Sequence, residues 1–393
     1  MKNTILAGIA LLAVSAVPAL SPALAQAPRT IDAILPLTGP TAFLGKAEQQ
    51  SLQVIEAAIA AGTIKAMPVH FEFHDDQSSP QTAVQLATGL LSSKPPVILG
   101  SGQVGMCNAM APLMKNGPVM YCFSPGIHPA NGGFVFTASV STRDLASAII
   151  RYYRMSGLTK IALLTSTDAS GQDAERNIRE ILAMPENHDI VVTGDARFNP
   201  GDVSVAAQIQ RIKGAGPQAL IAWATGAPIG TVFKAISDAG LDIPVATTDG
   251  NMTFAQMDQY AAFLPKTLFI PASQWMGPAA GHTLPPEMAA AQAAFFAAYK
   301  TINVAPDSAS TYGWDPTLLV LDALQKLGPT ATAEQLRQRL AATQGFVGIK
   351  GRYDFVAEPQ RGLNENEAVV TRWMPDKHAW VPVSEPRGVP LKN

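Results

Sequence analysis

Hydrophobic positions follow two alternating spacings along this chain. Short apolar runs such as Thr30–Leu35 and Lys160–Thr165 predict β-strands. Longer stretches with apolar residues three to four positions apart, such as Lys46–Ala61 and Gln172–Ala183, predict amphipathic helices. Strands that alternate with helices indicate parallel-rich sheets built from right-handed βαβ units. The pattern therefore predicts an α/β fold.

The alternation runs through two series and then changes. Residues 30–155 form one series of predicted strands and helices, and residues 160–248 form a second. The region after residue 286 is rich in predicted helices, with one from Trp314 to Leu327, and ends in short strands at Gly348–Asp354 and Ala368–Met374. We predict two doubly wound lobes, in which the late helices complete the first lobe and the last strands rejoin the second.

The first 25 residues have the pattern of a secretory signal peptide. Lys2 precedes an apolar run from Ile5 to Leu20, and Ala23-Leu24-Ala25 supplies the small residues of a cleavage site. A retained N-terminal anchor is the alternative. No later stretch approaches about 20 apolar residues, the length of a membrane-spanning helix. We expect a mature, exported, soluble protein that begins near Gln26.

Composition and charge exclude several classes of partner. The chain has 28 basic and 30 acidic residues and a formal net charge of -2, which argues against nucleic acid. No run of like charge suggests a membrane-surface patch. No phosphate-binding glycine loop, zinc-protease motif or nucleophile elbow is present, so we expect no cofactor and no enzyme activity. A secreted hydrolase remains a remote alternative, because catalytic triads are recognised by geometry.

Several segments, in this order, resemble one known family. They are ILPLTGPTAFLG at 34–45, FHDDQSSPQTAV at 73–84, VILGSG at 97–102, YCFSPG at 121–126 and AISDAGLDIPVATTDG at 235–250. The chain resembles the periplasmic ligand-binding receptors of branched-chain amino-acid-type (Leu/Ile/Val-binding protein-like) ABC transporters. The resemblance covers essentially the whole mature chain. It implies the type I periplasmic binding protein fold: two Rossmann-like lobes joined by three chain crossings.

The resemblance also implies the boundaries of the lobes. Lobe 1 would hold residues 27–142 and 273–349, and lobe 2 would hold residues 143–272 and 350–393. The crossings would lie near Thr142, Ala272 and Lys350.

In open α/β sheets, ligands bind beyond the carboxyl ends of the strands, and three such loops are expected from lobe 1. The first places Phe43 at the rim of the cleft, or packs it under its own loop. The second carries Gln103 and Val104 where amino-acid binders of the family have a serine, a departure that weakens a plain leucine or valine assignment.

The third loop holds Ser124, Gly126 and Ile127, which match family positions that bind the ligand carboxylate. His128 follows them, either as a contact to an anionic or phenolic ligand or as a solvated surface residue.

Lobe 2 is expected to add further ligand contacts. Asp249 matches the family's acidic residue that accepts hydrogen bonds from the ligand ammonium, and a turn residue in Asp-Gly is the alternative. Thr225 and Gly226 follow a predicted strand, and Ser170 stands where many relatives have an aromatic residue. Trp275 is a candidate to cover an apolar ligand, with packing between the lobes as the alternative.

Cysteine and histidine pairs suggest further chemistry. Cys107 and Cys122 would lie at one edge of a sheet, where they form either a disulfide beside the cleft or two free buried thiols. His70 and His74 next to Asp75-Asp76 superficially suggest a metal cluster, but this segment matches a structural strand end of the family, so we expect no metal.

The predicted function is that of a periplasmic solute-binding protein of an ABC importer. It would capture a small hydrophobic amino acid or related carboxylate between closing lobes, act as a monomer and dock on permease subunits of the inner membrane. The alternatives are a ligand that is an aromatic or short aliphatic acid or an amide, and a sensor for a signalling partner.

Overall fold

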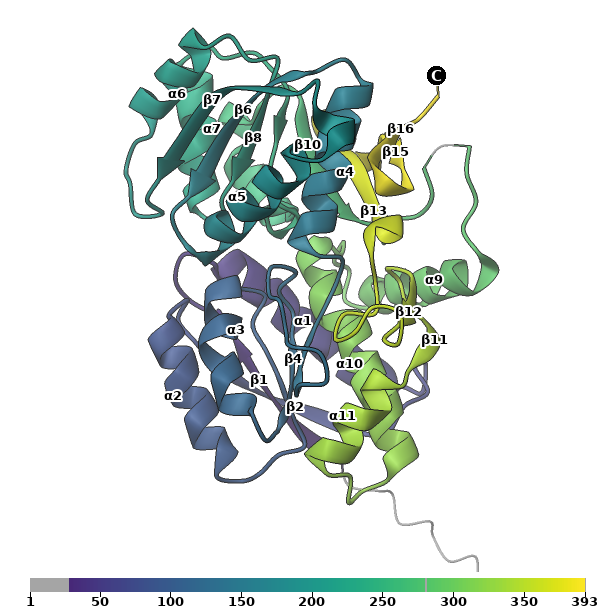
Figure 1. Ribbon diagram of the computed structural model, residues 1–393. Coiled ribbons are helices and arrows are strands. Elements are labelled where there is room, and N and C mark those ends of the chain that lie inside the picture. Colours follow the sequence, from purple (N-terminus) through teal and green to yellow (C-terminus); the bar gives the residue numbers. More distant parts are fainter. Residues whose placement is uncertain (1–27, 280, 393) are drawn as a thin grey trace, which may run out of the picture.

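The chain folds into two α/β lobes, one above the other (Figure 1). The computed structural model describes residues 28–279 and 281–392, so the predicted signal peptide of residues 1–25 lies outside the described part. Each lobe has its own parallel-rich sheet with helices on both faces. The predicted α/β fold with two parallel-rich sheets is confirmed. No helix within the described residues is both long and apolar enough to cross a bilayer.

The first lobe is built on a five-stranded parallel sheet of order β2-β1-β3-β4-β5. Ile31, Ala33 and Leu35 of its central strand β1 (Arg29–Leu35) join the core shared with α1 and α10, whereas Ile34 joins the core under α2 and α3. This alternation places helices on both faces. The remaining bounds are β2 (Val69–Asp75), β3 (Val97–Leu99), β4 (Val119–Cys122), β5 (Val135–Thr137), α1 (Ala42–Ala60), α2 (Pro80–Leu91), α3 (Val104–Met110), α9 (Pro286–Lys300), α10 (Ser308–Leu327) and α11 (Ala333–Ala341).

The second lobe is built on a seven-stranded sheet of order β14-β13-β10-β9-β8-β6-β7. The strands from β7 to β10 are parallel, and β13 and β14 add an antiparallel edge. The bounds are β6 (Lys160–Ser166), β7 (Val191–Phe198), β8 (Ala219–Trp223), β9 (Val245–Ala246), β10 (Leu268–Ser273), β13 (Ala368–Met374), β14 (Ala379–Pro382), α4 (Thr142–Met155), α5 (Ala169–Leu182), α6 (Ala206–Gly214), α7 (Pro228–Asp238) and α8 (Phe254–Gln259). Two hairpins, β11 (Gln344–Val347) with β12 (Arg352–Asp354) and β15 (Ser384–Glu385) with β16 (Val389–Pro390), complete the strands.

The chain passes between the lobes before α4, after β10 and before β13. The segment before the last passage contacts the first lobe. The Phe355 ring packs edge-to-face on Phe136 of the first lobe, with centroids 5.7 Å apart, and the Thr137 amide donates to the Gln360 carbonyl. The predicted crossing near Lys350 stays a prediction, and these contacts favour a boundary between Gln360 and β13.

A buried carboxylate fixes the segment that precedes this passage. Asp315 of α10 is completely buried and accepts hydrogen bonds from the Ile349 amide (2.9 Å), the Lys350 amide (3.1 Å) and the Tyr353 hydroxyl (3.0 Å). Gly348 lies so close that an added Cβ would be 2.4 Å from the Asp315 carboxyl carbon. Asp315 therefore holds segment 348–353 against α10 of the first lobe.

A disulfide between Cys107 and Cys122 joins α3 to the end of β4, with the two Cα atoms 6.1 Å apart and 15 residues of sequence separation. A cross-link over a loop of this length restricts the unfolded chain, and its removal costs about 3 kcal/mol. We expect the double variant Cys107→Ala/Cys122→Ala to unfold at a lower urea concentration than the wild type. The matched control is wild-type protein unfolded in dithiothreitol, which should lose the same stability. A double variant as stable as the oxidised wild type would contradict this expectation.

Candidate functional site

A cleft lies where loops from the two sheets face each other. It is lined by the loops after β3 and β4 of the first lobe and by the loops after β6, β8 and β9 of the second. These are carboxyl ends of parallel strands, the usual location of ligand sites in open α/β sheets. Of the residues predicted from the sequence, the structure brings seven together in this lining: Gln103, Val104, Ser124, Gly126, Ser170, Thr225 and Asp249.

Asp249 is the charged side chain of this lining and is 1% exposed. It opens a short 3-10 helix (Asp249–Asn251), and its Oδ1 accepts a hydrogen bond from the Thr248 hydroxyl at 3.2 Å. Burial raises the pKa of Asp249, and the neighbouring Tyr312 hydroxyl and Lys350 ammonium oppose that rise. The second carboxylate oxygen, Oδ2, has no hydrogen-bond partner among the described residues.

A group of buried ionisable side chains lies beside the cleft in the first lobe. Lys350 is completely buried, its ammonium lies 4.8 Å from the centre of the Tyr312 ring, and burial lowers its pKa to about 8 against the attraction of Asp315, Asp249 and Glu48. Glu48 is also fully buried, and its Oε2 accepts a long hydrogen bond (3.4 Å) from the amide of Gly102 in the cleft lining. Burial raises the pKa of Glu48 well above its ordinary value.

Tyr312 contacts the cleft but was not expected from the sequence. It lies in the first turns of α10, which begins at Ser308, six residues before the predicted start at Trp314. Asp307 caps this helix. Its carboxylate accepts a hydrogen bond from the Ser310 amide (3.0 Å), and the Ser310 hydroxyl oxygen accepts one from the Asp307 amide (3.2 Å). The capping pattern Asp307-x-x-Ser310 was the sequence signal that marks the earlier start.

Five predicted site residues do not line this cleft. Phe43 is half-buried in the first turn of α1, and Ile127 is buried in the core under α3. Trp275 packs against Phe295 and Phe296 of α9, with ring centroids 6.4 and 6.3 Å apart. Gly226 and His128 instead contact the opposite lobe. The apolar wall that the sequence suggested is therefore reduced here to Val104, Pro125 and Trp223.

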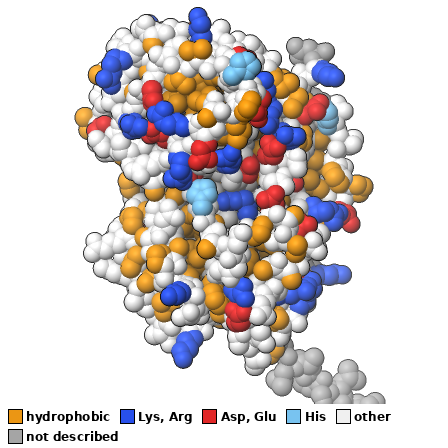
Figure 2. Space-filling view, viewed as in Figure 1, with side chains coloured by type: hydrophobic (Ala, Val, Ile, Leu, Met, Phe, Trp, Pro, Cys, Tyr) orange, Lys and Arg blue, Asp and Glu red, His pale blue; other side chains and the backbone are white. Residues whose placement is uncertain are grey.

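His128 forms a hydrogen bond across the two lobes at the edge of the cleft. Its Nε2 lies 2.7 Å from Oδ1 of Asp173, on α5 of the second lobe. Arg176 also pairs with this carboxylate, and Asn177 donates to it at 3.2 Å. Figure 2 shows charged side chains of both signs gathered across the middle of this face, where the lobes meet. The lobes are thus held together by polar contacts outside the cleft.

Gly226 marks a close approach of the two lobes. It has a positive φ of 86°, and an added Cβ would lie 2.8 Å from the Pro40 carbonyl oxygen and 3.0 Å from Thr41 Cγ2 of the first lobe. The next amide, of Ala227, donates to that same Pro40 oxygen at 3.1 Å. The structure therefore has the lobes in contact.

We expect Gly226→Ala to weaken ligand binding by about tenfold, because its methyl group would push the lobes apart. The matched control is Gly240→Ala, in the same lobe. It has a positive φ of 58° and no atom within 4 Å of an added Cβ, so it shares only the backbone strain of about 1–2 kcal/mol. Isothermal titration of both variants makes the comparison. Equal affinities would show that this contact does not affect binding.

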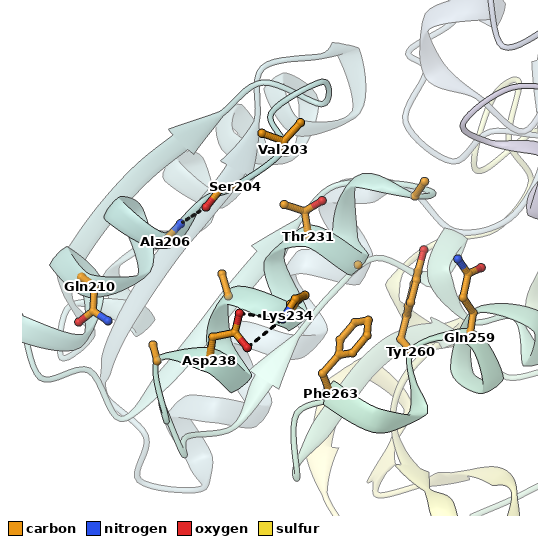
Figure 3. A pocket seen from close by; sticks show the side chains of 14 residues that line it. Val203, Ser204, Ala206, Gln210, Thr231, Lys234, Asp238, Gln259, Tyr260 and Phe263 are labelled. Carbon is orange, nitrogen blue, oxygen red and sulfur yellow. Dashed lines mark hydrogen bonds and ion pairs between the residues drawn. The ribbon is translucent and has the colours of Figure 1, made fainter.

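A larger cavity of about 450 Å³ lies on the outer face of the second lobe (Figure 3). It is bordered by α6, α7 and the segment around Tyr260 and Phe263, all from one lobe. Its charged side chains, Lys234 and Asp238, pair with each other at 2.9 Å. Since its charged groups pair with each other and no residue of the first lobe lines it, we regard the smaller interlobe cleft as the candidate site.

The two histidines of β2 pair with carboxylates of neighbouring elements. His70 lies 3.0 Å from Glu56 of α1, and His74 lies 2.9 Å from Asp32 of β1. No group of three or more potential metal ligands occurs among residues 28–279 and 281–392.

Comparisons with known proteins agree with this architecture. A family model described as "Periplasmic binding protein" matches residues 29–378. A curated relative, Leu/Ile/Val-binding protein homolog 3 of Brucella melitensis, is 24% identical over 235 residues; the match covers 58% of this chain and 62% of that protein's length.

Three solved structures share the fold. An extracellular ligand-binding receptor from Rhodopseudomonas palustris HaA2 is 19% identical, with a TM-score of 0.78, and the match covers 91% of this chain and 100% of that one. The branched-chain amino acid transporter substrate binding protein LivJ of Streptococcus pneumoniae, in complex with isoleucine, is 19% identical over 91% and 99% of the chains, with a TM-score of 0.74. An R. palustris ABC transporter solute binding protein in complex with benzoate is 19% identical over 93% and 98%, with a TM-score of 0.75. Because the family match extends over most of its length, this chain belongs to the periplasmic binding protein family.

Proposed function

We propose that this protein is the solute-binding component of an ABC importer. It captures a small molecule in the periplasm between its two lobes and presents the closed form to permease subunits in the membrane. It acts as a monomer, without a cofactor, and catalyses no reaction. The observation that carries the proposal is that loops from both lobes line one small cleft, so that a bound ligand joins the lobes.

Ligand binding and lobe closure are coupled in this proposal. Gln103 and Ser124 come from the first lobe, and Thr225 and Asp249 come from the second, so all four reach the ligand only when the lobes are together. A ligand shifts an equilibrium only by its difference in affinity for the two states. Contacts from both lobes supply that difference, and hinge closure between domains is a well-known form of such a transition.

The family limits the location of the protein but leaves its ligand open. Periplasmic binding proteins are periplasmic or extracellular, in agreement with the predicted signal peptide. The sequence resemblance favours a hydrophobic amino acid or a related carboxylate. Two relatives with the same fold hold isoleucine and benzoate, respectively, so the fold accommodates ligands of different chemistry.

Affinity purification from membranes tests the role in import. The tagged protein would be trapped with its ligand, cross-linked in intact cells and purified from detergent extracts. Recovery of permease subunits supports import, whereas recovery of a histidine kinase in their place supports the sensor alternative. The Gly226→Ala variant, which disfavours closure, should recover less permease than the Gly240→Ala control.

A further inference from the structure

Three side chains of the cleft have polar atoms that make no hydrogen bond of good geometry among the described residues: Gln103 Nε2, Asp249 Oδ2 and Tyr312 OH, the last two being neighbours. The exposed fractions of these residues are 8%, 1% and 1%, so bulk water does not satisfy them. Gln103 Nε2 only donates, the Asp249 carboxylate only accepts, and a tyrosine hydroxyl does both. A buried polar group without a partner costs free energy, and a ligand that supplies the partner recovers it. The complementary ligand therefore has at least one acceptor and at least one N–H or O–H donor.

The charges of the cleft disfavour an anion. Asp249 is the charged side chain of the lining, and neither lysine nor arginine lines the cleft within the part of the chain that the structure describes. Lys350 lies beside the cleft, but it faces three acids, namely Glu48, Asp249 and Asp315. A carboxylate placed next to Asp249 would meet a like charge in a buried site, without a cation of its own.

Backbone amides of the two first-lobe loops that could bind a carboxylate already have hydrogen-bond acceptors. Four amides that border the cleft already donate to nearby side chains: Gly102 to Glu48 Oε2 (3.4 Å), Gln103 to Ser101 Oγ (3.3 Å), Ser124 to Cys122 Sγ (3.3 Å) and Gly126 to Ser124 Oγ (3.3 Å). An anion bound by backbone amides would have to replace these bonds. A single carbonyl oxygen needs only the free Nε2 of Gln103.

The size of the cleft also favours a small ligand. With the lobes in contact, its volume is about 10 Å³, close to what one water molecule requires. Any organic solute therefore fits only if the lobes separate, which strains the bonds from the Ala227 amide to the Pro40 carbonyl and from the Ser308 amide to the Met252 carbonyl (both 3.1 Å). A ligand of a few heavy atoms requires the least separation.

We propose that the cleft selects a small uncharged amide, a solute with one carbonyl oxygen and an NH2 group, over branched amino acids and carboxylate anions. The carbonyl oxygen accepts from Gln103 Nε2, and the NH2 group donates to Asp249 Oδ2 and Tyr312 OH. This assignment rests on the proposed function, because it concerns the ligand that the two lobes enclose.

Calorimetric titration of the purified protein tests the assignment. The probes are acetamide, propionamide and urea as neutral amides, glycine as a small zwitterion, isoleucine as a branched amino acid and benzoate as an anion. We expect at least one neutral amide to bind about tenfold more tightly, or better, than glycine, isoleucine and benzoate. Tighter binding of glycine, isoleucine or benzoate overturns the amide assignment and leaves the solute-binding function standing.

Two variants of Gln103 locate the contact. Gln103→Glu keeps the volume but removes the Nε2 donor, and Gln103→Leu removes both polar atoms. Each should weaken amide binding by about tenfold or more. Gln210→Leu is the control, because Gln210 is an exposed residue of α6 at the outer cavity of the second lobe (Figure 3). Thermal unfolding of each variant shows that it is folded.

Two further results would overturn the assignment. One is amide binding that both Gln103 variants retain in full. The other is a failure of every probe amide to bind. In the second case, purification of the permease complex decides separately whether the proposed import function also fails.

Discussion

Asp249→Ala is expected to weaken ligand binding by more than about tenfold, equivalent to at least ~1.5 kcal/mol, the lower range for a lost hydrogen bond to a charged group. The expectation follows from the position of the carboxylate, which is buried in the cleft lining with its Oδ2 atom free of partners among the described residues. Calorimetric titration with the ligand identified from the probe panel measures the loss. Asp238→Ala is the matched control, since Asp238 pairs with Lys234 on the exposed face of α7 in the same lobe.

The conservative variant Asp249→Asn distinguishes the two kinds of ligand that Asp249 can serve. A ligand ammonium would lose a charge-assisted bond, so its affinity should fall about as far as in Asp249→Ala. A neutral amide needs only an acceptor, which the asparagine carbonyl still provides, and its affinity should fall by about threefold or less. An Asp249→Ala protein with unchanged affinity would exclude any direct role of this side chain in binding.

The largest loss of stability is expected from Asp315→Ala. The substitution leaves the amides of Ile349 and Lys350 and the Tyr353 hydroxyl without their acceptor, and it removes the acid that most strongly favours the charged form of buried Lys350. A buried donor left without its acceptor costs about 1–3 kcal/mol, so the loss of three such bonds is expected to destabilise the protein by roughly 3–5 kcal/mol. Urea unfolding at neutral pH, followed by tryptophan fluorescence, measures the change.

Asp322→Ala provides the control for this substitution. Asp322 lies on the same helix, α10, but pairs with Lys326 at the surface, where an ion pair contributes roughly 0–1 kcal/mol. If Asp315→Ala and Asp322→Ala unfold at the same urea concentration, the buried network does not stabilise the first lobe.

The sequence predicted best those features that depend on residues close together in the chain, such as strands, helices and strand ends. The alternating strand and helix spacings identified both sheets, and the predicted strand ends placed Ser124 and Asp249 at the carboxyl edges that form the cleft. The position of Phe43 differed from the expected rim loop because α1 begins at Ala42, four residues before the predicted start at Lys46. Phe43 therefore lies in the helix and not in the rim loop, and Gly45 packs so closely that an added Cβ would be 2.2 Å from the Pro36 carbonyl oxygen.

Other features depend on contacts between distant parts of the chain. Trp275 follows β10, but the rings of Phe295 and Phe296 on α9 determine where it packs. Lys350 lies between Ile349 and Gly351, and nothing in that local pattern indicates that a lysine is buried there. Its burial results from Asp315, 35 residues earlier, which accepts a hydrogen bond from the Lys350 amide. Such effects require the folded structure.

The disulfide has a consequence for how the protein matures. Gln103 precedes Cys107 by a few residues and Ser124 follows Cys122, so the bridge links the two first-lobe loops that line the cleft. Thiols stay reduced in the cytosol and pair only in an oxidising compartment. In the proposed function the chain is exported, so the bridge would form after translocation, and until then these two loops would lack this covalent link. Recombinant material made without oxidation would correspond to that immature form.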